Sequence, residues 1–143
     1  MQLTSKGRYA VMAMADLSAQ DSRAVTIAEI AARQGLSAAY LEQLFARLRR
    51  AGLVEGVRGP GGGYRLARPA EEVSVADVIA AVDERIATTR CEPGAKLGCT
   101  GKSERCQTHN LWAALSCKIN DFLSGVSLKD LADGRLSARE LAQ

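Results

Sequence analysis

The sequence predicts a mainly α-helical protein with one small β-hairpin, and three observations support this fold class. Of the 143 residues, 47% are hydrophobic but only 4% are aromatic, so the core must consist of small aliphatic side chains, which favour helices. Apolar positions recur at helical spacing behind Ser/Thr-x-x-Asp/Glu start signals at Thr26, Ser74 and Ser127. Two short apolar runs flank a glycine-rich loop, which is typical of a hairpin.

Composition and charge exclude several classes of protein. No uncharged apolar run approaches the ~20 residues that a membrane span needs, so we expect no membrane partner. Lys6 and Arg8 before a short apolar run imitate a secretory signal, but that run is at the lower limit of signal length. The helical spacing of Val11, Met14 and Leu17 predicts a first helix instead. We therefore expect a cytoplasmic protein with reduced cysteines.

Residues 26–51 have the pattern of a helix-turn-helix. Thr26 and Glu29 form a capping box, and Gly35 ends this helix because glycine most readily adopts the left-handed C-cap conformation. Ser37 caps a second helix, which extends to about residue 50. Because so few residues separate the two helices, they must meet at a tight corner. The apolar stripe of the second helix consists of Leu41, Leu44, Phe45 and Leu48.

A hairpin is predicted directly after the helix-turn-helix. Its strands are expected at 53–57 and 64–67, joined by the glycine-rich stretch 58–63. A phosphate-binding loop is a weaker interpretation, because the glycine spacing breaks at Tyr64 and no Lys-Ser/Thr pair follows. A helix-turn-helix followed by a hairpin is a winged helix-turn-helix. We therefore predict a DNA-binding domain over residues 1–70, with the wing at 53–67.

The predicted DNA-binding domain is basic. Residues 1–68 carry ten lysines and arginines against five acids, whereas residues 69–143 carry nine against eleven. On the polar face of the second helix, Gln43 can pair with adenine and Glu42 can accept from a cytosine amino group. In the wing, Arg58 can enter a narrow minor groove. A solvated helix face with ion pairs is the alternative interpretation. The candidate DNA-contacting residues are Lys6, Arg8, Tyr40, Glu42, Gln43, Arg49, Arg50, Arg58 and Gly59.

Residues 71–143 are acidic overall and have a different pattern. A start signal at Ser74 predicts another helix, whose end at Asp83 and Glu84 we interpret as solvated. A loop rich in glycine and cysteine covers about 85–109, and a long helix from about residue 108 to 123 follows. Start signals at Ser127 and Ser137 predict two short terminal helices. The apolar face of the long helix consists of Leu111, Leu115, Ile119 and Phe122.

The loop contains four candidate metal ligands. Cys91, Cys99, Cys106 and His109 follow the spacing C-x7-C-x6-C-x2-H, and the last two can converge because they lie three residues apart at a helix start. The spacing leaves a [2Fe–2S] cluster, a Cys₃His zinc site and buried free thiols open. Cys117 lies roughly 12 Å beyond His109 along a helix, at ~1.5 Å per residue, so we expect a surface or interface thiol.

Five motifs stand out in combination. They are LTSKGRYAV at 3–11, YLEQLF at 40–45, VRGPGGGY at 57–64, AVDE at 81–84, and CQTH at 106–109 with Leu111-Trp112. Together they resemble the IscR family, the iron–sulfur cluster assembly regulators of bacteria, over about residues 1–131. The chain departs from this family in its wider gaps between ligands and in Ala39, where family members can carry serine.

The resemblance implies a homodimeric winged-helix transcription factor that pairs through its long C-terminal helix. It implies that the four candidate ligands hold a [2Fe–2S] cluster, with the cluster-assembly machinery as its donor. Family members repress cluster-assembly operons, including their own, with the cluster bound, and act at a second promoter class without it. The resemblance also implies pseudo-palindromic promoter DNA as the partner, with base contacts from Glu42, Gln43 and Arg58.

Two other functions were weighed against this one. A nitric-oxide or redox sensor of the same broad superfamily is disfavoured by His109, because the nitric-oxide sensors lack that ligand. A small iron–sulfur or zinc enzyme would need a substrate pocket and an acid–base pair near the metal, but the only histidine is already assigned. We therefore predict that the protein is not an enzyme. The alternative to a cluster-sensing regulator is a nitric-oxide/redox-sensing or zinc-binding regulator of the same superfamily.

Overall fold

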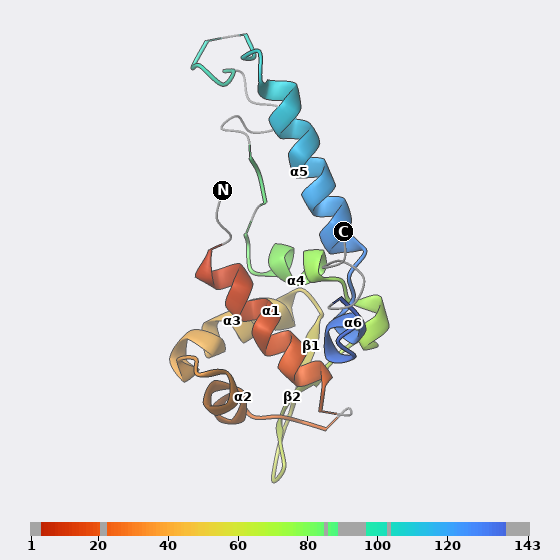
Figure 1. The fold of residues 1–143 in the computed structure, drawn as a ribbon. Helices are drawn as coiled ribbons and strands as arrows, with labels where there is room; N and C mark the ends of the chain where they lie inside the picture. The colour runs from red at the N-terminus through yellow and green to blue at the C-terminus, as the bar shows by residue number, and fades with distance from the viewer. Residues whose placement is uncertain (1–3, 21–22, 85, 89–96, 103, 137–143) are drawn as a thin grey trace.

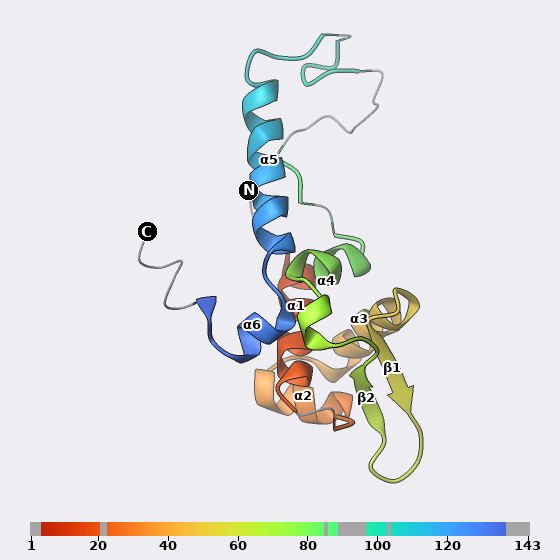
Figure 2. The same cartoon turned by 90° about the vertical axis from the view of Figure 1, so that its right-hand side faces the viewer.

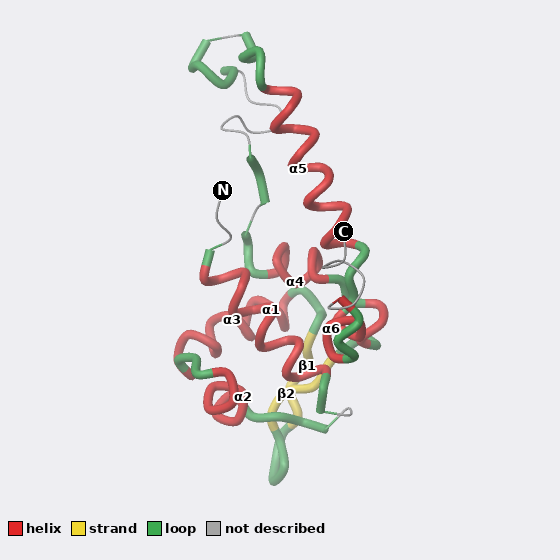
Figure 3. Tube along the Cα trace, in the orientation of Figure 1, coloured by secondary structure: helices red, strands yellow, loops and turns green. Residues whose placement is uncertain are grey.

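The chain folds into a helical head and one long helix that leads away from it (Figure 1). The structure, a computed structural model, describes residues 4–20, 23–84, 86–88, 97–102 and 104–136. Its elements are α1 (Ser5–Ser18), α2 (Ile27–Gln34), α3 (Ala38–Arg50), β1 (Val54–Val57), β2 (Gly63–Leu66), the 3-10 turn η1 (Ala70–Glu72), α4 (Val75–Ala81), α5 (His109–Ser124) and α6 (Leu128–Ala132). Helices predominate, as Figure 3 shows, and this part of the predicted fold class is confirmed.

The helices begin at the predicted capping residues. At the start of α2, the Glu29 N–H donates to Thr26 Oγ1 at 3.1 Å and the Thr26 N–H donates to Glu29 Oε2 at 2.8 Å. The same reciprocal pair of bonds begins α4 and α6. Gly35 ends α2 in the left-handed conformation, with a φ of 65°. These boundaries are confirmed, whereas the start signal at Ser137 lies outside the described residues.

The hairpin is confirmed, and each strand lies within one residue of its predicted bounds. β1 and β2 pair antiparallel, with Val57 opposite Gly63. Gly63 has a φ of 143°, and a Cβ atom there would lie 2.4 Å from the Val25 carbonyl oxygen. This close approach lets the Val25 N–H donate to the Tyr64 carbonyl at 2.8 Å, a bridge that the sequence did not predict. With α2 and α3, the hairpin completes a winged helix-turn-helix.

One hydrophobic core holds the helix-turn-helix against α1, the hairpin and α4. Phe45 of α3 is fully buried, and its ring centroid lies 5.0 Å from that of Tyr64 in β2. This contact ties the second helix of the helix-turn-helix to the wing. The other buried side chains that join these elements include Met14, Ile30, Leu41, Leu44, Leu48, Val78 and Leu128.

A buried carboxylate joins α1 to α2. Asp16 is only 7% exposed and accepts from Arg33 Nη2 at 2.7 Å and from Gln34 Nε2 at 2.8 Å. Burial acts to raise the pKa of Asp16, but the hydrogen bonds from Arg33 and Gln34, together with the charge of Arg33, hold this pKa below its ordinary value. Because α2 precedes the tight corner to α3, this contact also fixes the angle of the helix-turn-helix against α1.

The long helix α5 differs from every helix of the head. None of its residues is buried, although four large apolar side chains lie along it: Leu111, Trp112, Leu115 and Phe122. After α5 the chain returns to the head, where the Val75 N–H donates to the Val126 carbonyl at 2.9 Å. Figure 2 shows α5 and the hairpin at opposite ends of the molecule. Over the described part of the chain, no helix is both long and apolar enough to span a membrane.

The end of α4 differs from its prediction. Asp83 is exposed, as expected, but Glu84 is half-buried and one of its carboxylate oxygens is shielded from solvent. Glu84 Oε1 accepts from the Thr4 N–H at 2.7 Å, which places the carboxylate at the start of α1. The interpretation of Glu84 as a solvated residue is therefore wrong, because it ignored a contact with a segment eighty residues earlier in the chain.

Candidate DNA-binding face and cysteine site

The exposed face of α3 carries the residues that the sequence predicts as base-reading. Glu42 and Gln43 are exposed near the start of the helix, and Arg49 and Arg50 are exposed in its last turn. Ser37 fixes the helix start, since its Oγ accepts from a backbone N–H in the first turn. The buried stripe of α3 faces the core of the head, so the polar side chains lie on the solvent side. α3 is therefore placed as a recognition helix would be.

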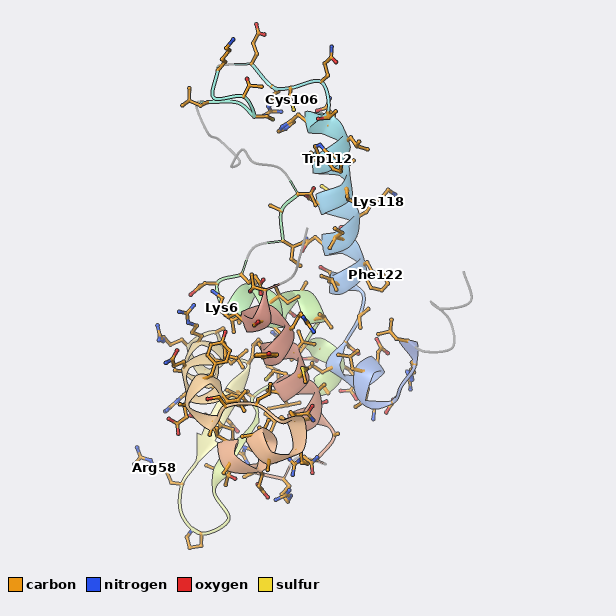
Figure 4. All side chains as sticks on the ribbon, turned by 60° about the vertical axis from the view of Figure 1, so that its left-hand side comes forward. Lys6, Arg58, Cys106, Trp112, Lys118 and Phe122 are labelled. Atoms are coloured by element: carbon orange, nitrogen blue, oxygen red, sulfur yellow. The ribbon has the colours of Figure 1, made fainter. Side chains whose placement is uncertain are left out.

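The wing presents Arg58 at a tight turn. Arg58 is exposed, and Figure 4 shows it projecting from the hairpin away from the body of the head. The turn depends on its glycines: Gly59 has a φ of 93°, and a Cβ atom at Gly62 would lie 2.4 Å from the Val57 carbonyl oxygen. Gly59 thus shapes the turn that lets Arg58 extend from the end of β1, and its predicted contact with DNA stays a prediction.

The other predicted DNA contacts have different surroundings. Arg8 is exposed on α1. Lys6 is half-buried, and its Nζ lies 3.5 Å from the Asp83 carbonyl oxygen. Tyr40 is half-buried and packs edge-to-face on Tyr9, with ring centroids 6.1 Å apart. Lys6 and Tyr40 therefore contribute to the packing of the head, whereas Arg8 contacts solvent. Contact with DNA remains a prediction for all three residues.

Two of the candidate metal ligands meet at the start of α5. Cys99 Sγ and His109 Nδ1 are 3.1 Å apart, which is a hydrogen-bond distance for a thiol and an imidazole. Cys106 lines the same cavity of about 270 Å³, at the outer end of α5 (Figure 4). The remaining lining residues are Thr88, Thr100, Thr108 and Trp112. Cys91 lies outside the described residues, and Cys117 is exposed on α5, as expected.

The convergence of Cys106 and His109 that their spacing allows stays a prediction, and both residues line the same cavity. The Cys106 thiol lies 3.5 Å from the Thr108 hydroxyl, while Cys99 lies at hydrogen-bond distance from His109. Between Cys99 and its neighbours the loop makes a tight turn, in which the Gly101 N–H donates to the Gly98 carbonyl at 3.0 Å. Among the residues placed in the structure, no three His, Cys, Asp or Glu side chains surround a single ion position.

A protein-family model described as Rrf2, iron-dependent transcriptional regulator, matches residues 3–134. The chain belongs to the Rrf2 family. Among Rrf2 regulators, the HTH-type transcriptional regulator IscR of Photorhabdus laumondii is 53% identical, over 94% of this chain and 81% of its own length. IscR of Aliivibrio salmonicida is 56% identical, over 92% of this chain and 77% of its own length. The predicted resemblance to the IscR regulators is confirmed.

Solved structures lead to the same Rrf2 fold. The structure of IscR from T. potens is similar, with a TM-score of 0.75, 36% identity, and coverage of 97% of this chain and 91% of its own. CymR, the global cysteine regulator of B. subtilis, has a TM-score of 0.78 at 28% identity, with coverage of 93% and 97%. The winged helix-turn-helix is thereby confirmed. The chain is a DNA-binding transcriptional regulator and not an enzyme, as predicted.

Sequence reasoning missed one part of this Rrf2 chain, a polar contact between the loop and α5. The Thr88 N–H donates to Ser116 Oγ at 2.9 Å, and the Thr88 hydroxyl donates to the Trp112 carbonyl at 2.5 Å. Thr88 also lines the cysteine cavity. No sequence signal identifies this pair, because Thr88 and Ser116 lie twenty-eight residues apart and both types are common on surfaces.

Proposed function

We propose that the protein selects promoters according to whether it holds a [2Fe–2S] cluster. The observation that carries this proposal is the contact of Cys99 with His109, 3.1 Å apart at the start of α5, with Cys106 lining the same cavity. In the proposal, Cys91 supplies the fourth ligand. When bound, the cluster supplies a centre that can gain or lose one electron, and an imidazole ligand raises its potential relative to thiolates alone.

The donors in this cavity are compatible with an iron–sulfur cluster. Thiolates and imidazoles both bind iron in such clusters, and a cluster spreads its protein ligands over two irons. A single zinc ion would instead need all its ligands within about 2.0–2.3 Å of one point. The match to a family described as iron-dependent favours the cluster over the Cys₃His zinc site.

We propose that the regulator is a homodimer that pairs through α5. The four large apolar side chains along α5 are between 36% and 60% exposed, and a continuous apolar strip of this kind marks an interaction surface. Pairing of two copies would place two α3 helices and two wings in a two-fold arrangement. A two-fold protein reads two related half-sites, so the DNA target is a pseudo-palindromic promoter.

Regulation then follows from the state of the loop. In the cytoplasm, the cluster-assembly machinery supplies the cluster, and the loaded dimer represses the cluster-assembly genes, including its own. The dimer without a cluster binds a second class of promoter. Glu42, Gln43 and Arg58 select the bases, and the other exposed arginines of α3 contact phosphates. High identity with the IscR regulators over most of the chain supports this assignment.

Anaerobic purification followed by iron and sulfide analysis tests the cofactor. We expect about two irons and two labile sulfides per chain, with visible absorption, as a [2Fe–2S] cluster requires. Cys99→Ala should lose both elements, whereas Cys117→Ala, which removes an exposed thiol of α5, should retain them. Zinc without sulfide would favour the zinc-binding alternative. If neither metal nor sulfide is present after reconstitution, the proposal is wrong.

Gel shifts test the proposed switch. Cys91→Ala should lose affinity for the promoter of the cluster-assembly genes but retain binding to the second promoter class. The control is Cys117→Ala, which should bind both promoters as the unchanged protein does. Equal binding of Cys91→Ala to both promoters at wild-type affinity would remove the cluster from the regulation of DNA binding.

A further inference from the structure

The segment between α4 and the cysteine loop contacts both ends of the regulator. We define it as the linking segment, residues 82–84 and 86–88, which are its described members. Its inner part lies against α1 and α3 in the head. Its outer part lies along α5 and reaches the cysteine cavity. The linking segment thus contacts the recognition helix, the first helix and α5.

The inner part of the linking segment is attached to the recognition helix. Arg47, in the last turns of α3, donates from Nη1 to the Val82 carbonyl at 3.2 Å and to Asp83 Oδ2 at 2.9 Å. Asp83 has a φ of 56°, the left-handed conformation that residues other than glycine seldom adopt. This conformation turns the chain outward at the point where Arg47 is bound. A shift of the segment at Asp83 therefore acts directly on α3.

The same part of the segment is attached to the start of α1. Glu84 Oε1 accepts from the Thr4 N–H at 2.7 Å, and a negative charge is favourable at a helix N-terminus. The carboxylate fits only because residue 7 is glycine: a Cβ atom there would lie 1.9 Å from Glu84 Oε2. Lys6 reaches the Asp83 carbonyl from the same turn of α1. Glu84 thus occupies a space that α1 leaves for it.

The outer part of the segment is attached to α5 beside the cysteine cavity. Ile86 packs against the small apolar cluster of Val75, Ile79 and Val126. Two residues later, the Thr88 N–H donates to Ser116 Oγ at 2.9 Å, and Thr88 lines the cavity with Cys99 and His109. Cys91 follows Thr88 by three residues in the sequence. Ligation by Cys91 would therefore act on the outer end of this segment.

We infer that Asp83 and Glu84 are positioning residues that transmit the state of the cysteine loop to α1 and α3. The part of this inference that concerns the cluster rests on the proposed function. A segment held at both ends can shift only if the elements bound to it shift or if its contacts break. Gly7, Arg47 and Glu84 thus determine whether the loop alters the DNA-binding face.

Two substitutions separate the contacts without touching the predicted DNA or metal residues. Gly7→Ala keeps the helical backbone of α1 and favours it by propensity, but its Cβ atom displaces the Glu84 carboxylate. Arg47→Gln removes the contact between α3 and Asp83. Gly125→Ala is the matched glycine control, because a Cβ atom there would meet nothing closer than 3.5 Å. Lys129→Gln is the matched charge control, since Lys129 of α6 pairs with Asp133, the residue that follows this helix.

The experiment compares reconstituted and cluster-free dimers by hydrogen–deuterium exchange and by promoter affinity. In the unchanged protein, reconstitution should alter exchange in α1 and α3 and change promoter affinity by at least about fivefold, the lower range of allosteric coupling. Gly7→Ala should lose the response of α1, and Arg47→Gln should lose that of α3. Both variants should retain their iron and sulfide. In each, the ratio of promoter affinities between the reconstituted and the cluster-free dimer should approach one. The two control variants should behave as the unchanged protein does.

A cluster-free measurement makes the inference independent of the cofactor. The double substitution Thr88→Val and Ser116→Ala removes both hydrogen bonds that attach Thr88 to α5. It should raise exchange in the first turn of α1, but this change should be absent in the Gly7→Ala background. Equal effects of the double substitution in both backgrounds, or no effect in either, would overturn the inference. The inference would also be overturned if Gly7→Ala and Arg47→Gln both kept the wild-type ratio of promoter affinities between reconstituted and cluster-free dimers. Absence of iron and sulfide from the unchanged protein would instead overturn only the proposed function.

Discussion

The head and α5 bury their apolar side chains in different ways. In the head, Phe45, Ile30 and Met14 are fully buried within one chain, against partners from several helices and the hairpin. In α5, no residue is buried, and Phe122 is 47% exposed. The head therefore has its own hydrophobic core, whereas α5 has an apolar face that the described part of the chain leaves uncovered. This contrast is the strongest support for pairing of two copies along α5.

The largest expected effect tests the uncovered face. Leu115→Glu places a charge on this face in both copies of the proposed dimer. Burial of a leucine stabilises by about 1.5–3 kcal/mol, so two copies lose about 3–6 kcal/mol and the dimer dissociation constant rises roughly 10² to 10⁴-fold. Sedimentation velocity measures the change. Asn120→Glu, a polar position about 140° around the helix, is the control and should leave the dimer intact. An unchanged dissociation constant in Leu115→Glu would remove α5 from the interface.

A substitution in the head should act without changing assembly. Phe45→Ala removes the ring that joins α3 to Tyr64 of the wing and should lower the free energy of unfolding by about 3–5 kcal/mol. The loss should be the same at all protein concentrations when the head unfolds before the dimer separates. Thermal unfolding at several concentrations measures it. A loss that depends on concentration would mean that the head also relies on the partner copy.

The buried Asp16 gives the head a dependence on acid. Its pKa is held below the ordinary value, so its contribution to stability is complete above the ordinary pKa of about 3.9 and is lost as pH falls through the lowered pKa. Arg33→Gln should lower the free energy of unfolding at neutral pH by about 1.5–3 kcal/mol and flatten its decline in acid. Arg23→Gln breaks an exposed pair and should cost less than about 1 kcal/mol. If the free energy of unfolding declines equally with falling pH in Arg33→Gln and in the unchanged protein, Asp16 does not have this role.

The polar face of α3 should determine base choice without affecting the fold. Glu42→Ala should reduce discrimination between the promoter and single-base variants by about 1–3 kcal/mol at the contacted base pair. Arg49→Ala is the comparison, because loss of a phosphate contact weakens binding to all sequences alike and lowers the salt dependence. Competition assays with substituted promoters measure both. If Glu42→Ala weakens every sequence equally, the carboxylate does not select a base.

The smallest expected effect concerns the contact between the linking segment and α5. Ser116→Ala removes the acceptor of the Thr88 N–H, a bond of about 1 kcal/mol, and should speed amide exchange at Thr88 roughly fivefold. Ser124→Ala, at the other end of α5, should leave exchange at Thr88 unchanged. Unchanged exchange at Thr88 in Ser116→Ala would mean that this end of the segment is held by its other contacts.

Local signals in the sequence were sufficient for most of the head. The pairing of Thr26 with Glu29 and the glycine at position 35 determine where α2 begins and ends, since both act within a few residues of the chain. The glycine-rich turn around Arg58 located the hairpin within one residue of each strand end. The apolar face of α5 was also predicted from helical spacing, although its exposure was not.

The same reasoning failed where a contact joins distant segments. Glu84 looks like a solvated acid in the sequence, because nothing near it shows that Gly7 leaves space for its carboxylate. The contact of Cys99 with His109 joins two residues ten positions apart, and the ligand spacing alone does not predict it. Asp16 is similar, since its partners lie in another helix.

The sequence by itself determined the secondary structure, the winged helix-turn-helix and the residue types available to DNA and metal, because capping, helical spacing and glycine turns act over a few residues. Only the tertiary structure decided which of those residues meet. The position of Glu84 at the start of α1 and the pairing of Cys99 with His109 depend on how separate elements pack, and packing brings together residues whose types carry no mark of their partners.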